Sequence, residues 1–141
     1  MLLYLYNTET TPERVFSGER EECMIFIWYP KCSTCQKAKK WLESENITFE
    51  ERLIKEQNPS EAELREWQKR SGLPLKKFFN TSGLLYKSLN LKDRLPEMTD
   101  DEQFELLASD GMLVKRPLLI GENFVLAGFR EAEWKEKTGA D

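Results

Sequence analysis

A change of pattern around Pro30 constrains the fold of this chain more than any other feature. Residues 24–29 (MIFIWY) are apolar and rich in β-favouring side chains, a composition that predicts a buried strand. After Pro30 the apolar positions recur at helical spacing with lysines between them, which predicts a helix as far as Asn46. Cys32 and Cys35 lie at this junction. The first begins the predicted helix, and the second lies one turn inside it, facing the core.

The pattern that follows extends this junction into a β-α-β unit. Residues 47–53 predict a second strand, which a right-handed crossover through the helix places parallel to the first. Two capping boxes, Ser60 with Glu63 and Thr99 with Glu102, then begin apolar-studded helical segments. The middle of the chain is therefore predicted to be all-helical.

The period changes again near the C-terminal end. Residues 118–120 and 124–126 predict a β-hairpin, and residues 131–136 predict a final helix with Trp134 turned inward. The order β-α-β, helical block, β-β-α is the thioredoxin-like layout. We therefore predict an α/β, thioredoxin-like fold with an inserted all-helical subdomain at about residues 58–111.

The length of 141 residues suits one domain with a core of its own. We assign that domain to residues 24–141. Residues 1–23 show no sustained period, and we interpret them as an N-terminal extension that arises from a mis-annotated start upstream of Met24. The alternative is a short edge strand over residues 2–6.

The composition of the chain excludes several classes of catalytic site and of binding partner. The sequence has no histidine, which excludes Cys-His and Ser-His catalytic pairs and the commonest zinc ligand. The net charge of −4 gives no support for direct binding of nucleic acid, and no apolar run approaches the roughly 18 residues of a membrane span. We therefore expect a cytoplasmic protein with no membrane partner, in a compartment that keeps thiols mostly reduced.

A cysteine pair at the start of a helix favours thiol chemistry. The free amides and the dipole of a helix N-terminus favour a thiolate at Cys32, and Lys31 adds an adjacent cation. Cys35, one turn later, is near enough to displace a group bonded to Cys32. We predict Cys32 as the nucleophile and Cys35 as the resolving thiol, with binding contacts from Lys31, Ser33 and Thr34.

Two other interpretations of the cysteine pair stay open. One is half of a zinc site, for which only Cys23 and carboxylates remain as further ligands. The other is plain packing, since Cys35 alone also suits a core as a small hydrophobic residue. We favour redox chemistry, and we expect neither a metal ion nor an organic cofactor.

A second candidate is the stretch LVKRPLLI at residues 113–120. A proline directly before a sheet strand cannot donate to the ladder and favours a turn, in the cis or the trans form. In a thioredoxin-like fold Arg116 would approach the helix N-terminus, where it would hold an anion or stabilise the thiolate. We count Pro117 as a further binding residue. The alternative is an ordinary surface arginine beside an ordinary proline.

A third candidate is the stretch KKFFNTSG at residues 76–83. Exposed phenylalanines would indicate a partner surface, but Phe78 and Phe79 lie within short helical pieces, where such residues usually belong to the core. We predict that both are core residues.

Three stretches together resemble the arsenate-reductase-like family that includes the redox regulator Spx: YPKCSTCQKAKKWL, KKFFNTSG with LNLK, and DGMLVKRPLLI with GFRE. The resemblance covers nearly all of residues 24–137 and is closest to small bacterial members with a Cys-x-x-Cys. It implies a thioredoxin-like fold with a helical insertion. It also implies a reactive cysteine at Cys32 and an arginine before a proline, at Arg116 and Pro117.

The resemblance also shows departures. Glutaredoxin-coupled arsenate reductases of the family surround the oxyanion with three arginines, of which only Arg116 matches cleanly here. Asn80 stands in place of the second, and Arg130 lacks clear register with the third. In Spx the same block contacts the α subunit of RNA polymerase; Gly72 matches its glycine, and Asn80 again replaces an arginine.

We therefore predict a thiol-disulfide oxidoreductase-like protein with little arsenate reductase activity. Its partner is expected to be a thiol reductant (glutathione, glutaredoxin or thioredoxin) or a protein disulfide. The alternative is an Spx-like redox-sensing regulator that binds the RNA polymerase α subunit without binding nucleic acid directly.

Overall fold

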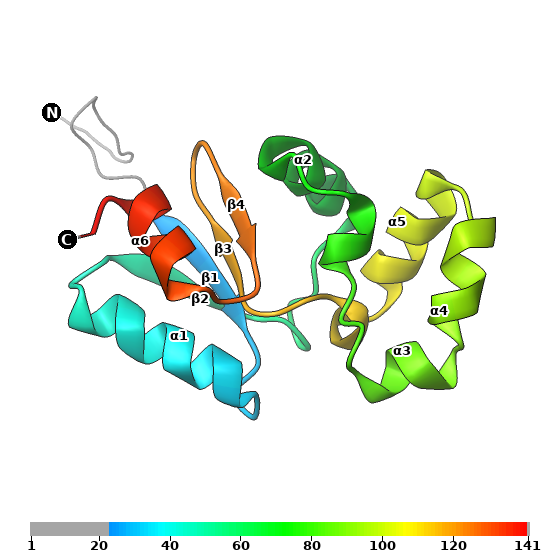
Figure 1. Cartoon of the computed structure of the whole chain (residues 1–141), viewed down its shortest axis with the longest axis horizontal. Helices are drawn as coiled ribbons and strands as arrows, with labels where there is room; N and C mark the ends of the chain where they lie inside the picture. Colours follow the sequence, from blue (N-terminus) through cyan, green and yellow to red (C-terminus); the bar gives the residue numbers. More distant parts are fainter. Residues whose placement is uncertain (1–22, 141) are drawn as a thin grey trace, which may run out of the picture.

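The computed structural model describes residues 23–140, which form a four-stranded mixed sheet with helices on both faces (Figure 1). The strands are β1 (Met24–Trp28), β2 (Phe49–Leu53), β3 (Leu118–Ile120) and β4 (Val125–Ala127), in the spatial order β2-β1-β3-β4. β1 and β2 run parallel, whereas β1–β3 and β3–β4 are antiparallel. This arrangement confirms the predicted α/β class, the β-α-β unit and the hairpin.

Helices α1 (Ser33–Ser44) and α6 (Glu131–Thr138) cover one face of the sheet (Figure 1). Side chains alternate along a strand, so Phe26 of β1 and Leu119 of β3 point to this face and pack with Trp134 in one core cluster. Trp134 is fully buried, as predicted.

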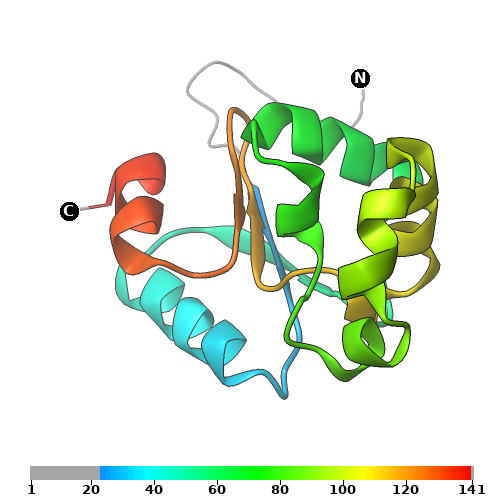
Figure 2. The same cartoon turned by 45° about the vertical axis from the view of Figure 1, so that its right-hand side comes forward.

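The helical insertion lies between β2 and β3 in the chain and covers the other face of the sheet (Figure 2). It consists of short α-helices and 3₁₀ helices (η): α2 (Glu61–Ser71), η1 (Leu75–Phe78), α3 (Leu84–Ser88), α4 (Leu91–Arg94), η2 (Leu95–Glu97), α5 (Asp100–Ser109) and η3 (Gly111–Leu113). Both predicted capping boxes are present and begin α2 and α5. Gly72 ends α2 in the left-handed conformation, with φ of 71°.

The strand residues next to those of the first cluster face the insertion. Ile27 of β1 and Leu118 of β3 pack there with Phe78 and Phe79, in a second core cluster. Phe78 is 0% exposed and Phe79 is 1% exposed, which confirms that both are core residues and not a partner surface.

Close contacts fasten the insertion to the sheet. Arg52 of β2 donates hydrogen bonds to both carboxylate oxygens of Glu63 in α2, at 2.8 and 2.7 Å. At the other end of α2, Arg70 donates to the carbonyl oxygen of Gly121 in the β3–β4 turn, at 2.6 Å. These bonds fix the position of α2 relative to β2 and to the β3–β4 hairpin.

The structure differs from the prediction at the ends of elements. β2 begins two residues late, because the amide of Ile47 donates to the carbonyl oxygen of Leu42 and closes the end of α1. β4 is shifted by one residue, because the carbonyl oxygen of Phe124 accepts from Gly121 within the turn. The expectation for residues 1–23 lies outside the described residues, apart from Cys23. Across 23–140, no helix is both long and apolar enough to cross a membrane.

Candidate functional site

The N-terminus of α1 presents Cys32. This residue is the N-cap of the helix, with φ of −95° and ψ of 120°, and its Sγ accepts a hydrogen bond from the backbone amide of Cys35 at 3.4 Å. The preceding turn is held by two bonds: Cys32 N donates to Tyr29 O at 3.0 Å, and Gln36 Nε2 donates to Pro30 O at 2.6 Å. A thiolate at Cys32 would therefore receive an amide hydrogen bond from a fixed turn.

Cys35 has the opposite surroundings. It is fully buried, and burial, with smaller contributions from Cys32, raises the pKa of its thiol to about 12 even though the Tyr29 backbone and the charge of Arg116 act to lower it. Cys32 is half-buried and opens to a cleft. At neutral pH, Cys32 is therefore the thiol within reach of a substrate, and Cys35 is a protonated thiol behind it.

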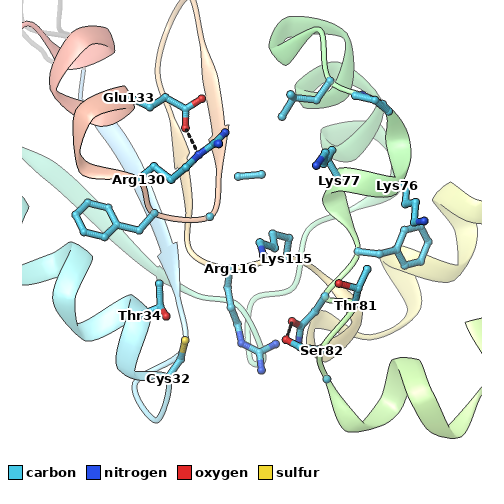
Figure 3. A pocket seen from close by; sticks show the side chains of 18 residues that line it. Cys32, Thr34, Lys76, Lys77, Thr81, Ser82, Lys115, Arg116, Arg130 and Glu133 are labelled. Carbon is cyan, nitrogen blue, oxygen red and sulfur yellow. Dashed lines mark hydrogen bonds and ion pairs between the residues drawn. The ribbon is translucent and has the colours of Figure 1, made fainter. Parts of the chain in front are cut away.

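Cys32 lies at the edge of a cleft of about 740 Å³ between the sheet domain and the insertion (Figure 3). Its lining comes from α1, from the region around η1, from the segment before β3, and from the turn between β4 and α6. The chain therefore assembles the cleft from four separate segments.

The lining of this cleft is cationic. It contains five basic side chains: Lys76, Lys77, Lys115, Arg116 and Arg130. Among the described residues that line it, only Glu133 is acidic, and its carboxylate lies 3.7 Å from Arg130 Nε (Figure 3). The cleft is thus suited to an anionic ligand, although the whole chain carries a net charge of −4.

Arg116 lies close to the cysteines. Its Nη1 donates to Met112 O at 3.3 Å, and its guanidinium carbon lies 5.0 Å from the centre of the Tyr29 ring. In Figure 3 the side chain projects into the space between Cys32 and Ser82. The peptide bond between Arg116 and Pro117 is cis.

A neutral loop faces Cys32 across the cleft. Asn80, Thr81 and Ser82 line this side, and Ser82 Oγ lies 3.5 Å from Asn80 Oδ1. The loop is positioned by an isolated bridge between Phe79 and Val114, together with a bond from Asn80 N to Leu113 O at 2.8 Å. The loop therefore presents one amide and two hydroxyl side chains to the cleft, and no charged side chain.

The predicted site residues occupy three kinds of position. Cys32, Thr34 and Arg116 line the cleft. Cys35 and Pro117 are buried, and Lys31 and Ser33 are exposed at the start of α1, outside the cleft lining.

Several cleft residues were missed at the level of sequence. Lys76 and Lys77 directly precede the phenylalanines of KKFFNTSG, and Lys115 directly precedes Arg116. Arg130, which lacked clear register, lies in the cleft lining after all. The sequence did contain a signal for the lysines, because they lie within the stretches at residues 76–83 and 113–120 that were already candidates.

Potential metal ligands are sparse around these residues. Over the part of the chain that the structure describes, no group of three or more histidine, cysteine, aspartate or glutamate side chains has an arrangement able to hold a metal ion.

Comparison with known proteins gives consistent matches. A crystal structure of an ArsC family related protein from Bacteroides fragilis superposes with a TM-score of 0.80 and 56% identity, over 82% of this chain and 97% of that one. The protein YusI of Bacillus subtilis strain 168 is 56% identical over 80% of this chain and 96% of its own length. The regulatory protein MgsR of the same strain is 31% identical over 80% of this chain and 88% of its own length.

The family match covers most of the structure described above. Residues 27–137 fit the ArsC family, a span that runs from β1 into α6 and includes both cysteines, the helical insertion and every basic residue of the cleft. The chain therefore belongs to the ArsC family.

Proposed function

We propose that this protein is a thiol-disulfide oxidoreductase in which Cys32 is the nucleophile and Cys35 the resolving thiol. The observation that carries the proposal is the difference between the two thiols. Cys32 borders the cleft and accepts an amide hydrogen bond, whereas Cys35 is buried one turn behind it. Attack on a disulfide needs an accessible sulfur, and Cys32 is the cysteine of the pair that borders the cleft.

In the first step the Cys32 thiolate attacks one sulfur of a substrate disulfide. A bond forms between Cys32 Sγ and that sulfur, the substrate S–S bond breaks, and the other half leaves as a thiolate that takes a proton from water. The amide of Cys35 and the guanidinium of Arg116 are placed to stabilise negative charge during this exchange.

In the second step Cys35 resolves the mixed disulfide. Its proton passes to the departing substrate thiolate, its sulfur attacks Cys32 Sγ, and the second half of the substrate leaves as a thiol. Cys32 and Cys35 are then joined by a disulfide. Two molecules of glutathione, or one dithiol of the glutaredoxin or thioredoxin class, reduce this disulfide, restore both thiols and are themselves oxidised to a disulfide.

A second candidate function follows from the relatives. MgsR is named a regulatory protein, and relatives from Listeria innocua and other bacteria are named global transcriptional regulator Spx. Gly72, the position matched to the polymerase-contacting glycine, is exposed at the end of α2, and a Cβ built there meets nothing within 4 Å. In this alternative the oxidation state of Cys32 and Cys35 would control binding to the RNA polymerase α subunit.

The proposed function is tested with a Cys23→Ser background, which removes the exposed thiol outside the cleft. In this background we expect Cys35→Ser to accumulate a mixed disulfide on Cys32 when it is mixed with bis(2-hydroxyethyl) disulfide. Cys32→Ser should form none, and the parent should turn over with a thiol reductant. Equal turnover by parent and Cys32→Ser would contradict the proposal.

The regulator alternative has its own experiment. Purified polymerase α subunit is passed over the oxidised and the reduced protein, with Gly72→Arg as the variant at the exposed position. Its thermal midpoint is measured alongside, because a side chain at φ of 71° is strained. Redox-dependent retention that Gly72→Arg abolishes, together with absent disulfide turnover, would favour the regulator instead.

A further inference from the structure

We propose that the lysines of the cleft select disulfides that carry carboxylates near the sulfur atoms. This inference rests on the proposed function, because it concerns which substrate reaches Cys32. Its residues are Lys76, Lys77 and Lys115, which we refer to as the cleft lysines.

The cleft lysines are brought together by backbone pairing. Phe79 and Val114 form an antiparallel bridge, and Lys115 N donates to Phe78 O at 2.8 Å. The segment that follows Lys77 therefore runs beside the segment that carries Lys115, and both side chains face the cavity that contains Cys32 (Figure 3). Two stretches of sequence about 40 residues apart therefore contribute charge to one cleft.

The charges of the cleft lysines are not neutralised within the structure. Among the described residues, none of the three lies within 4.0 Å of a carboxylate oxygen, whereas Lys39, Arg52, Arg65 and Arg70 all form ion pairs elsewhere. Lys115 is also half-buried, with its Cε beside Gly128, where a Cβ would lie 3.0 Å away. The cleft lysines therefore remain free to pair with a ligand.

The spacing of the charges favours an extended anion. Figure 3 shows Lys77 and Arg130 on opposite sides of the cleft, with Lys115 between them and Arg116 nearest Cys32. A compact oxyanion contacts only the donors immediately around it, whereas this cleft of about 740 Å³ has the size of an ordinary small-ligand site. A disulfide with separate carboxylates would place its sulfur at Cys32 and its charges against the cleft lysines.

Two sources could supply this chemistry: a small thiol-derived disulfide with carboxylate groups, or an acidic segment of a protein that contains a disulfide. The shared feature is negative charge beside the S–S bond. Selection would act through attraction of the anion into the cleft, so it should weaken as salt screens the lysines.

The first test measures the charge around Cys32 without turnover. In the Cys23→Ser background, Cys32 is alkylated with iodoacetate, which is anionic, and with iodoacetamide, which is neutral. The ratio of the two rates cancels the thiolate fraction, because both reagents react with the same thiolate. We expect Lys77→Gln and Lys115→Gln each to lower this ratio by about twofold to fivefold at low salt.

The matched control is Lys69→Gln. Lys69 is exposed on α2 and does not line the cleft, so this variant removes the same charge from a different place. We expect it to leave the ratio unchanged. An equal decrease in Lys69→Gln, or no decrease in either cleft variant, would overturn the proposal.

The second test compares kcat/KM for three disulfides: dithiodiglycolate (anionic), bis(2-hydroxyethyl) disulfide (neutral) and cystamine (cationic). We expect kcat/KM to be highest for the anionic disulfide and lowest for the cationic one. The differences among the three should be smaller in the double variant Lys77→Gln/Lys115→Gln and at high salt. Equal values for all three, with turnover still dependent on Cys32, would overturn the selectivity and leave the proposed function standing. No turnover of any of them would overturn the proposed function itself.

A third test distinguishes a small-molecule disulfide from a disulfide in an acidic protein segment. A peptide disulfide flanked by glutamates is compared with the same peptide flanked by glutamines and with dithiodiglycolate. A glutamate peptide that exceeds dithiodiglycolate indicates a protein substrate, and the reverse indicates a small molecule. Equal rates for the glutamate and glutamine peptides would contradict charge selection for either source.

Discussion

The backbone amide of Cys35 donates a hydrogen bond to Sγ of Cys32 at 3.4 Å, so the proposed resolving residue helps to hold the proposed nucleophile before any disulfide forms. The same helical turn that places this amide buries the side chain of Cys35. One turn of α1 thus gives its two thiols different accessibility and different chemistry, although the cysteines are only three residues apart.

The first prediction concerns alkylation of the reduced, folded protein. We expect iodoacetamide at pH 8 to modify Cys32 and the exposed Cys23, and to leave Cys35 unmodified, because burial raises the pKa of Cys35 to about 12 and keeps reagent away. Peptide mass spectrometry measures each site. Unfolding in urea is the control, since it should make all three react. Modification of Cys35 as fast as Cys32 in the folded state would contradict the assignment of roles.

The second prediction concerns stability at alkaline pH. The pKa of Cys35 is raised from 9.0 to about 12 by burial, so the folded state holds a proton that the unfolded state loses. Its contribution to stability is present below pH 9 and is lost as pH rises towards 12. Between these limits the free energy of unfolding should fall by up to about 1.4 kcal/mol per pH unit.

Urea unfolding in reductant measures this dependence, with Cys35→Ala as the matched control. In Cys35→Ala the free energy of unfolding should fall less steeply with pH above pH 9, whatever the stability of this variant at pH 7. Identical slopes in the two proteins would show that the thiolate of Cys35 is tolerated in the folded state.

Local sequence patterns predicted the junction around Cys32 well. The strand, the proline and the helix of this region each carry a signal within a few residues, and the structure has Cys32 as the N-cap of α1 with Cys35 inward. The capping boxes at Ser60 and Thr99 were likewise predictable, because all of their hydrogen bonds join residues three positions apart.

The cleft could not be predicted in the same way. Lys77, Lys115 and Arg130 are each far from Cys32 in sequence, and only tertiary contacts such as the Phe79–Val114 bridge bring them together. The position of Arg130 also depends on the hairpin, whose second strand begins one residue later than its apolar pattern indicates. A pattern of period two specifies which residues face the core, but not where a turn ends.

The third prediction concerns Trp134, which supports the cleft from behind. Its Nε1 donates to the carbonyl oxygen of Gly128, a cleft residue, at 3.0 Å. Trp134→Phe leaves that carbonyl without its donor and creates a small void, and should lower the free energy of unfolding by about 1–3 kcal/mol. Urea unfolding measures the change.

Trp28→Phe is the matched control for Trp134→Phe. Among the described residues, Nε1 of Trp28 is buried without a hydrogen-bond partner, so this substitution removes no such bond. We expect it to cost less than Trp134→Phe. If the two substitutions cost the same, the bond to Gly128 contributes nothing measurable.

The fourth prediction concerns Glu133, the only acidic side chain among the described residues of the cleft lining. Its carboxylate lies 3.7 Å from Arg130, whose side chain is 79% exposed, so the interaction is weak and screened. Glu133→Gln should raise the iodoacetate-to-iodoacetamide rate ratio at Cys32 by about twofold. Glu136→Gln, on the same helix but outside the cleft, is the control and should change nothing. A lower ratio in Glu133→Gln would mean that the carboxylate is needed to hold Arg130 in place.

The last prediction concerns arsenate. A doubly charged oxyanion beside a thiolate needs several fixed cationic donors, each contributing about 1.5–3 kcal/mol. Here Asn80 contributes only a neutral amide to the cleft lining, and Arg130 is exposed and lies 3.7 Å from Glu133. We expect little glutaredoxin-coupled arsenate reduction, and we expect Asn80→Arg to increase it at least about tenfold, since 1.4 kcal/mol corresponds to that factor. Asn80→Gln keeps the position neutral and should give no increase. Robust turnover by the unmodified protein, lost in both Arg116→Ala and Arg130→Ala, would show instead that these two arginines suffice for the oxyanion.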